Sequence, residues 1–319
     1  MQLRELGTSG IRISPIVMGT WQAGKKMWAG IEDEEILKAL RAACEAGINT
    51  FDTAEMYGDG HSERLIGQAL SGVRDRVVYA SKVFSNHLRY DQVVEACHRS
   101  LQNLGTEMID LYQIHWPSGS YGSERVPIEE TMRALHDLRE QGKIRAIGVS
   151  NFNRAQLEEA ARYGRIESLQ PPYSLFWRHV EKDARPYCVE HGITILAYSP
   201  LAQGLLTGKF KAGHKFARGD HRSKNRLFQP GNRERVLAAI ERLRPLAERH
   251  GATLGQLALA WVIAQPNTCA IAGARAAEQV TQNARAAEIQ LSASDLEEMD
   301  RIGRTVTDRL DDNPVQWDF

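Results

Sequence analysis

Residues 77–117 read VVYASKVFSNHLRYDQVVEACHRSLQNLGTEMIDLYQIHWP and have the pattern of a strand, a helix and a second strand. Val77–Lys82 and Ile109–His115 are short runs rich in β-branched, aromatic and other apolar residues. Arg89–Leu104, between them, has apolar residues three and four positions apart, as in an amphipathic helix. Two strands joined by a helix form a right-handed crossover between parallel strands. The stretch therefore predicts an α/β protein with a parallel sheet.

The same alternation recurs along the chain. Six further strands are expected at Ile16–Gly19, Asn49–Asp52, Ala146–Ser150, Ser168–Gln170, Ile193–Tyr198 and Cys269–Ala272. Helical spacing also appears in Asp33–Ala46, Ile128–Gln141, Arg154–Tyr163 and Glu181–His191. Eight alternations fit a closed (β/α)8 barrel, the TIM barrel, better than an open sheet. The opening residues 4–14 have a hairpin pattern, which we expect to cover the bottom of the barrel.

Length and composition agree with one globular domain over residues 1–319. The chain has 319 residues, of which 42% are hydrophobic and 25% charged, and a barrel of about 250 residues accounts for most of this length. Its 40 basic and 40 acidic residues balance, which argues against binding nucleic acid or an anionic membrane. We expect a monomer or a weak homo-oligomer that acts on a small molecule.

The four cysteines and the N-terminus indicate a cytoplasmic protein without a metal site. Cys44, Cys97, Cys188 and Cys269 lie far apart and lack metal-ligand spacing. The first ten residues, MQLRELGTSG, lack the apolar run of a secretory signal. Residues 252–274 carry no charge and are long enough on paper to span a bilayer. Their pattern instead predicts a buried helix, a turn and a strand.

Three connections are longer than the rest, namely Trp116–Pro127, Pro200–Asn232 and the tail Thr305–Phe319. Long loops at the C-terminal face of a barrel build its binding cleft. Polar residues gather at this face, because Asp52, Lys82 and His115 end strands and Tyr57 follows one closely. Each alone has an ordinary structural interpretation, such as a helix cap, a solvated strand end or a satisfied interior histidine. Their convergence on one face favours a site.

Longer motifs contain these residues or follow them in the chain, namely FDTAEMYG at 51–58, SKV at 81–83, DLYQIHWP at 110–117, GKIRAIGVSNF at 142–152 and AYSPLAQGLLTGKF at 197–210. Together these motifs resemble the aldo-keto reductase superfamily. The last motif is most similar to the bacterial branch. The resemblance covers nearly the whole chain and implies a (β/α)8 barrel that holds NADP(H). It also implies a catalytic tetrad of Asp52, Tyr57, Lys82 and His115.

The chemistry of carbonyl reduction suits these four residues. Hydride transfer to a carbonyl creates an alkoxide, so the site needs a proton donor close to the oxygen. Tyr57 is the expected donor, and an ammonium about 4 Å away is worth about 4 kcal/mol at an effective dielectric near 20, enough to lower the phenol pKa toward neutrality. Asp52 would keep Lys82 charged, and His115 would donate a hydrogen bond to the carbonyl oxygen.

No GxGxxG motif follows a strand, so a Rossmann dinucleotide site is excluded. The resemblance instead assigns cofactor contacts along the barrel mouth. For the nicotinamide it implies Ser150, Asn151, Gln170 and Tyr198; for the pyrophosphate Ser199, Leu201, Gly204 and Lys209; and for the adenosine end Gly273, Arg275, Gln279 and Asn283. Arg275 at a helix start suits a 2′-phosphate, which favours NADPH over NADH. Gly273 stands where some relatives have lysine.

Aromatic residues near the mouth are candidates for a substrate pocket. They are Trp21, Met27, Trp28, Trp116 and Tyr121. Lys25 and Lys26 would either steer an anionic or polyhydroxylated aldehyde or form a solvated surface pair, and the second interpretation is favoured. The tail residues 313–319 are expected to fold over the site.

The sequence leaves two other functions open. The same superfamily includes barrels that regulate ion channels, so a nucleotide-sensing subunit with little turnover is one alternative. In the other, Lys82 forms a Schiff base in an aldolase-type barrel.

Overall fold

A closed barrel of eight parallel strands forms the centre of the computed structural model, which describes every residue except 27, 29, 218–219 and 317–319. The strands follow the order β10-β3-β4-β5-β6-β7-β8-β9 around the barrel. Their bounds are β3 Ile16–Gly19, β4 Thr50–Asp52, β5 Val78–Val83, β6 Ile109–Ile114, β7 Ile144–Ser150, β8 Ser168–Gln170, β9 Thr194–Ala197 and β10 Thr268–Gly273. The predicted TIM barrel is confirmed, with strand ends displaced by at most two residues.

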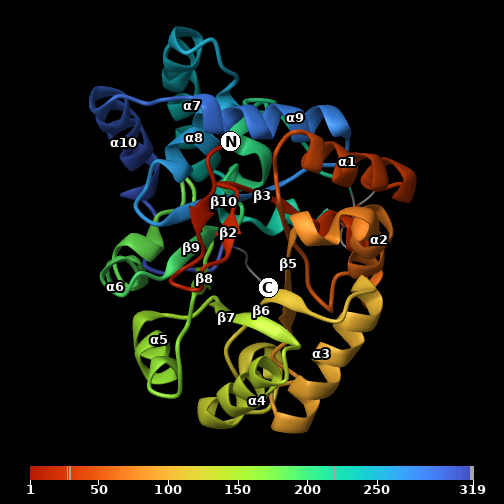
Figure 1. Cartoon of the computed structure of the whole chain (residues 1–319). Helices are drawn as coiled ribbons and strands as arrows, with labels where there is room; N and C mark the ends of the chain where they lie inside the picture. Colours follow the sequence, from red (N-terminus) through yellow and green to blue (C-terminus); the bar gives the residue numbers. More distant parts are fainter. Residues whose placement is uncertain (27, 29, 218–219, 317–319) are drawn as a thin grey trace.

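Helices surround the strands on the outside (Figure 1). Their bounds are α1 Asp33–Glu45, α2 His61–Leu70, α3 Tyr90–Leu104, α4 Ile128–Glu140, α5 Arg154–Ala161, α6 Ala184–Glu190, α7 Asn232–Arg249, α8 Leu254–Ile263, α9 Ala277–Arg285 and α10 Ala293–Thr307. One large apolar core fills the space between the strands and these helices. The uncharged stretch 252–274 folds as predicted, into α8, a turn and β10. Among the described residues, no helix is both long enough and apolar enough to cross a bilayer.

The predicted helix Glu181–His191 is wrong at its start. A short 3-10 helix, η4 (His179–Glu181), precedes α6, and Asp183 between them has a non-helical backbone. Glu181 accepts hydrogen bonds from Arg178, and the Asp183 carboxylate accepts one from the backbone N–H of Arg154. The second of these contacts is tertiary and holds Asp183, between the two elements, against the start of α5.

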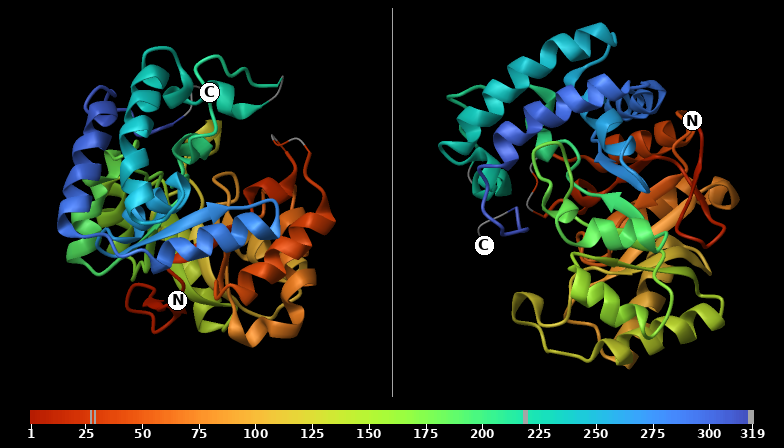
Figure 2. Two further views of the ribbon diagram at one scale, coloured as in Figure 1. Left: turned by 90° about the horizontal axis from the view of Figure 1, so that it is seen from above. Right: turned by 90° about the vertical axis from the view of Figure 1, so that its left-hand side faces the viewer.

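The N-terminal hairpin closes the bottom of the barrel, as predicted. It consists of β1 (Arg4–Glu5) and β2 (Arg12–Ile13), which are antiparallel. Its buried side chains join those of the barrel interior, and this second apolar cluster includes Leu6, Ile11, Leu111, Ala146 and Leu196. The hairpin lies at one end of the barrel, and the long segment after β9 lies at the other (Figure 2).

The described part of that long segment contains three short 3-10 helices, η5 (Ala202–Thr207), η6 (His221–Lys224) and η7 (Arg226–Phe228). Helix α10 extends to Thr307, so the predicted tail from Thr305 begins later than expected. Because all eight strands are parallel, their C-terminal ends meet at one face, and the polar residues at those ends are brought there together.

Candidate active site

Asp52, Lys82 and Tyr57 meet at the C-terminal face of the barrel. Asp52 is the last residue of β4, Lys82 is the penultimate residue of β5, and Tyr57 lies in the turn after β4. The Lys82 ammonium donates to Asp52 Oδ1 at 2.7 Å and to the backbone oxygen of Thr53 at 2.6 Å. It also lies 3.4 Å from the Tyr57 hydroxyl. The lysine therefore connects the carboxylate to the phenol.

This ion pair is withdrawn from water. The Lys82 side chain is 0% exposed and that of Asp52 is 4% exposed. Burial lowers the pKa of Lys82, whereas Asp52 and, behind it, Glu63 favour the charged form. A buried ammonium without such partners is strongly disfavoured. The negative charge of Asp52 therefore stabilises the charged form of Lys82.

The electrostatic effect on Tyr57 differs from the expectation based on the sequence. Burial raises the pKa of Tyr57 well above its usual value, and the Asp52 charge raises it further. The charge of Lys82 is compensated by Asp52 at 2.7 Å, so it does not offset the burial of the phenol. Tyr57 therefore holds its proton near neutral pH and is a donor in this state.

His115 follows β6 and packs edge-on against Tyr57, with ring centroids 5.6 Å apart. Burial, and secondarily the Lys82 charge, lower its pKa well below the usual value, so the imidazole is neutral at pH 7. Nδ1 is buried without a hydrogen-bonding partner. A buried N–H with no acceptor is costly, so the tautomer protonated on Nε2 is favoured. His115 then has one donor, Nε2–H, available to a ligand.

The residues assigned to the nicotinamide also lie together. Ser150 Oγ donates to the backbone oxygen of Gln170 at 2.7 Å, and Asn151 Nδ2 donates to Ser150 Oγ at 3.0 Å. Tyr198 Oη donates to Asn151 Oδ1 at 2.9 Å. Gln170 has an additional contact that the motif does not imply, because its Nε2 donates to Asp52 Oδ2 at 2.8 Å.

The loop after β9 has the backbone of an anion-binding turn. Ser199, Gln203 and Gly204 have φ values of 51°, 55° and 93°, and only glycine adopts such values without cost. Successive residues of this kind turn backbone N–H groups toward one concave side. A Cβ on Gly204 would lie 3.2 Å from Lys209 Cε, so glycine also lets this lysine approach. Leu201 accepts two of the bonds that hold the turn.

Among the described residues, a group of three cations gathers beside this loop. Burial lowers the pKa of Lys209, and the charges of Arg222 and Arg275 lower it further. Burial and Arg222 likewise lower the pKa of Arg275. Asp220, which pairs with Arg222, is a carboxylate close to this group. Three cations and one carboxylate, partly withdrawn from water, favour an anionic ligand such as a dinucleotide phosphate. The sequence reasoning missed Arg222, which lies in a loop without a motif.

The adenosine-end residues surround the start of α9. The Arg275 backbone N–H donates to Gln279 Oε1 at 2.8 Å, and Asn283 lies one turn further along the helix. A Cβ on Gly273 would lie 2.9 Å from Gln22 Oε1. Gln22 is fixed by its bond to the Ala274 oxygen at 2.7 Å. Gly273 thus makes room for Gln22. The positive charge that a lysine at position 273 would supply comes here from Lys209, Arg222 and Arg275.

Aromatic residues form two groups at the mouth. Trp21 and Trp28 meet edge to face at 5.4 Å, and both contact His221 at 4.7 Å. Trp28 also lies 5.2 Å from the Arg275 guanidinium, so it borders the cation group as well as the expected pocket.

The second aromatic group continues from His115. Trp116 packs against Tyr121 at 5.2 Å, Tyr121 stacks on Phe84 at 5.7 Å, and Phe84 meets His115 at 5.6 Å. Phe84 was missed because it directly follows the SKV motif in a loop. Met27 lies outside the described residues.

The two lysines near the mouth are paired with carboxylates. Lys25 lies 3.0 Å from Asp33, and Lys26 lies 2.7 Å from Asp59. The Lys25 pair is partly exposed and the Lys26 pair is largely exposed, so the favoured interpretation of solvated surface lysines agrees with the structure.

The tail after α10 is held against loops of the C-terminal face. The backbone oxygen of Pro314 accepts from Trp177 Nε1 at 3.0 Å, and that of Gln316 accepts from the Arg226 N–H at 2.9 Å. Trp177 follows β8, and Arg226 begins η7. Residues 317–319 of the predicted tail lie outside the described residues.

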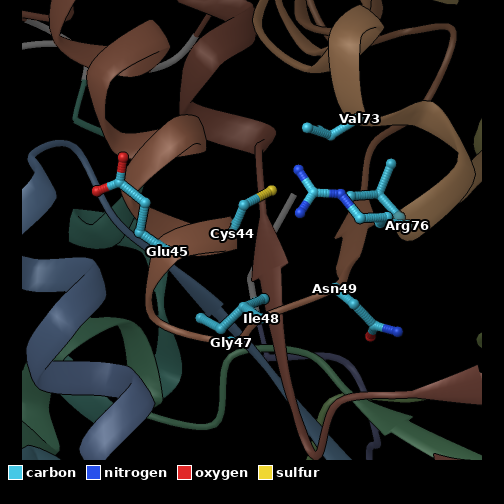
Figure 3. A pocket seen from close by; sticks show the side chains of 8 residues that line it. Cys44, Glu45, Gly47, Ile48, Asn49, Val73 and Arg76 are labelled. Atoms are coloured by element: carbon cyan, nitrogen blue, oxygen red, sulfur yellow. The ribbon is translucent and has the colours of Figure 1, made fainter.

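Two cavities lie away from these residues. One, of about 210 Å³, lies beside the end of α1 and is lined by Cys44 and Arg76 among others (Figure 3). The other is an open groove beside the end of α3. All four cysteines are free, and the described residues contain no group of three or more His, Cys, Asp or Glu side chains that would hold a metal ion.

A lysine in contact with a carboxylate and a phenol lies beside a cation group at the C-terminal face of a (β/α)8 barrel, which is the face where TIM-barrel enzymes have their active sites. The model of the Aldo/keto reductase family matches residues 15–304. The chain belongs to this family, and is thus an oxidoreductase of the aldo-keto reductase type.

Relatives of known name support this assignment. The chain is 36% identical to the aldo-keto reductase YhdN of Bacillus subtilis, over 95% of this chain and 93% of that protein. It is also 36% identical to the NADH-specific methylglyoxal reductase of Escherichia coli, over 91% and 94%. Among solved structures, the glycerol dehydrogenase AKR11B4 from Gluconobacter oxydans gives a TM-score of 0.88 at 35% identity and 97% coverage of both chains. An aldo/keto reductase from Klebsiella pneumoniae in complex with NADP and acetate gives 0.78 at 33% identity, with 99% of both chains covered.

Proposed function

We propose that this protein is an NADPH-dependent reductase that converts an aldehyde or ketone to the alcohol. The observation that carries the proposal is the Lys82 ammonium, which contacts Asp52 and lies within hydrogen-bonding distance of the Tyr57 hydroxyl. The bound nicotinamide supplies the hydride. The chain supplies the proton and the positive potential that a developing alkoxide needs.

Each of the four residues has a distinct role in this proposal. Tyr57 donates its proton to the carbonyl oxygen of the substrate. The raised pKa of Tyr57 keeps this proton on the phenol until hydride transfer makes the substrate oxygen basic. Lys82 stabilises the resulting phenolate, and Asp52 keeps Lys82 charged. His115 donates a hydrogen bond from Nε2 to the substrate oxygen and so orients it, because Nδ1 has no partner.

The cofactor proposal rests on the fit between the mouth and a dinucleotide. Lys209 and the turn around Gly204 would hold the pyrophosphate, and Arg275 with Arg222 would hold the 2′-phosphate of NADP(H). Ser150, Asn151, Gln170 and Tyr198 would hold the nicotinamide, and Ser199, Leu201, Gly273, Gln279 and Asn283 would border the remaining parts. The NADP complex of the Klebsiella relative supports this choice. The NADH-specific relative from Escherichia coli makes cofactor preference the first property to measure.

Substrate recognition falls to the aromatic residues Trp21, Trp28 and Trp116. The names of the relatives, a methylglyoxal reductase and a glycerol dehydrogenase, support small oxygenated carbonyl compounds as first substrates to test. We further propose that residues 1–319 act as one domain whose tail borders the site, and that the protein is a cytoplasmic monomer or weak homo-oligomer.

The decisive experiment is a spectrophotometric screen of NADPH and NADH oxidation with small aliphatic, sugar and aromatic aldehydes and with ketones. Turnover that requires Tyr57 supports the reductase. Tight NADPH binding without turnover on any substrate supports the nucleotide-sensing alternative instead. Borohydride trapping of a substrate on Lys82 without cofactor would support the aldolase alternative, which the three oxygen contacts of this ammonium disfavour.

A further inference from the structure

Gln113 is a polar side chain inside the barrel that no motif role explains. It lies on β6, is 0% exposed, and is preceded by the interior residue Leu111 two positions earlier. The interior of the barrel below it is apolar. Burying an amide in such surroundings is unfavourable unless its hydrogen bonds are made. The contacts of Gln113 therefore indicate what it does.

Those contacts lead to Asp52. Gln113 Nε2 donates to Asp52 Oδ2 at 3.4 Å, and Gln113 Oε1 accepts from Gln170 Nε2 at 3.4 Å. Gln170 Nε2 in turn donates to the same Asp52 oxygen at 2.8 Å. Ser168 Oγ completes the set by donating to Gln113 Oε1 at 3.4 Å. The individual bonds of Gln113 are long, so it acts by limiting the positions of its neighbours rather than through one strong bond.

The backbone makes a specific place for this side chain. Gln113 is in register with Lys82 on one side and with Gly148 on the other, and Gly148 is in register with Ser168. A Cβ on Gly148 would lie 2.9 Å from Gln113 Cγ and 2.2 Å from Ser168 Oγ. The missing side chain at 148 is therefore the space that Gln113 and Ser168 fill.

We propose that Gln113, seated in the space left by Gly148, is a positioning residue that orients Asp52 and, through Asp52, Lys82. This inference rests on the proposed function. Asp52 Oδ1 accepts a hydrogen bond from Lys82, and Asp52 Oδ2 accepts hydrogen bonds from Gln113 and Gln170. Because these donors come from β5, β6 and β8, they fix the rotation of the carboxylate and hold Oδ1 toward the ammonium. Gln113 also keeps the Gln170 amide turned toward Asp52.

The test replaces the amide with an apolar side chain of similar length, Gln113→Met. We expect kcat to fall five- to twentyfold with substrate KM changed less than threefold, because Gln113 is 0% exposed and therefore out of reach of a substrate at the barrel mouth. Gly148→Ala, which displaces the Gln113 side chain without replacing it, should lower kcat in the same way. Thr131→Val removes a buried hydrogen bond on α4, outside the site, and serves as the matched control for general destabilisation. Its kcat should stay within twofold of wild type.

A double-mutant cycle separates positioning from structural damage. If Gln113 acts through Gln170 and Asp52, Gln113→Met should cost much less in a Gln170→Met background than alone, whereas Thr131→Val should be additive with Gln170→Met. Additive losses for Gln113 and Gln170, or a Gln113→Met enzyme with wild-type kcat, overturn the inference.

A second readout does not depend on turnover. In protein labelled with ¹³C-lysine, the Lys82 signal is identified by its loss in Lys82→Arg, and its titration is followed by NMR. Asp52, Tyr57, His115 and Glu63 are the titratable groups that act on this ammonium. Looser contact with Asp52 should lower the Lys82 midpoint by at least half a pH unit in Gln113→Met and leave it unchanged in Thr131→Val. An unchanged Lys82 midpoint in Gln113→Met overturns the inference, even if no substrate is found. If this midpoint shifts but the wild-type protein turns over no substrate, only the proposed function is contradicted.

Discussion

Replacing Tyr57 with phenylalanine separates the chemistry of the site from its stability. The Tyr57 hydroxyl lies 3.4 Å from the Lys82 ammonium, whereas Asp52 Oδ1 and the Thr53 oxygen lie at 2.7 and 2.6 Å. Lys82 therefore keeps its two shorter partners in Tyr57→Phe. We expect the free energy of unfolding to change by less than about 1 kcal/mol. Loss of a general acid lowers turnover by about 100- to 10,000-fold.

Three measurements test this prediction. NADPH oxidation at saturating aldehyde gives kcat, fluorescence titration gives the NADPH dissociation constant, and urea unfolding gives stability. Tyr163→Phe is the matched control, because this exposed tyrosine follows α5, outside the site. A Tyr57→Phe enzyme that retains more than about a tenth of wild-type kcat would refute the acid role. A stability loss of several kcal/mol would refute the reasoning from contacts.

Further predictions concern the cations, the ion pair and the buried histidine. Arg275→Ala should weaken NADPH binding at least about tenfold, or about 1.4 kcal/mol, and NADH binding far less, since NADH lacks the 2′-phosphate. Equal effects in titrations of both cofactors would contradict the assignment of Arg275 to the 2′-phosphate. Asp52→Leu leaves Lys82 buried without its counter-ion and should lower the free energy of unfolding in urea by about 3–5 kcal/mol. Adding Lys82→Met should recover much of this loss, and a double variant no more stable than Asp52→Leu alone would count against the ion pair. The pKa of His115 is lowered in the folded protein, so its contribution to stability is present above the unfolded pKa of about 6.5 and is lost as pH falls. Between pH 6.5 and 5.5, wild type should therefore lose about 1 kcal/mol more than His115→Gln, and parallel stability curves would show that the histidine is not held neutral.

The alternation of strands and helices was sufficient to predict the barrel. Buried strands such as β3 (IVMG) and β9 (TILA) are short runs rich in apolar and β-branched residues between segments of other periodicity, and this pattern depends only on local sequence. The helix expected at Glu181–His191 starts later because Asp183 accepts a hydrogen bond from the backbone N–H of Arg154, 29 residues earlier in the sequence. No local pattern contains that information.

The candidate site divides in the same way. Asp52, Lys82 and His115 were found because charged or ionisable residues at the ends of buried strands are unusual. Phe84 and Arg222 were missed because they occupy loops, where their residue types are common. The net shift of the Tyr57 pKa was predicted in the wrong direction, because it depends on how deeply the phenol is buried and how closely Asp52 holds the Lys82 ammonium.

The sequence by itself determined the barrel, the order of its strands and the face at which the polar strand ends meet, because periodicity and chain direction impose these features. Only the tertiary structure decided which polar atoms touch. The contact of Gln113 with Asp52 depends on strand register and on the space at Gly148. The grouping of Lys209, Arg222 and Arg275 likewise depends on how segments distant in the sequence fold against one another. Burial and distance set the electrostatics of the site, and both arise only when the barrel closes.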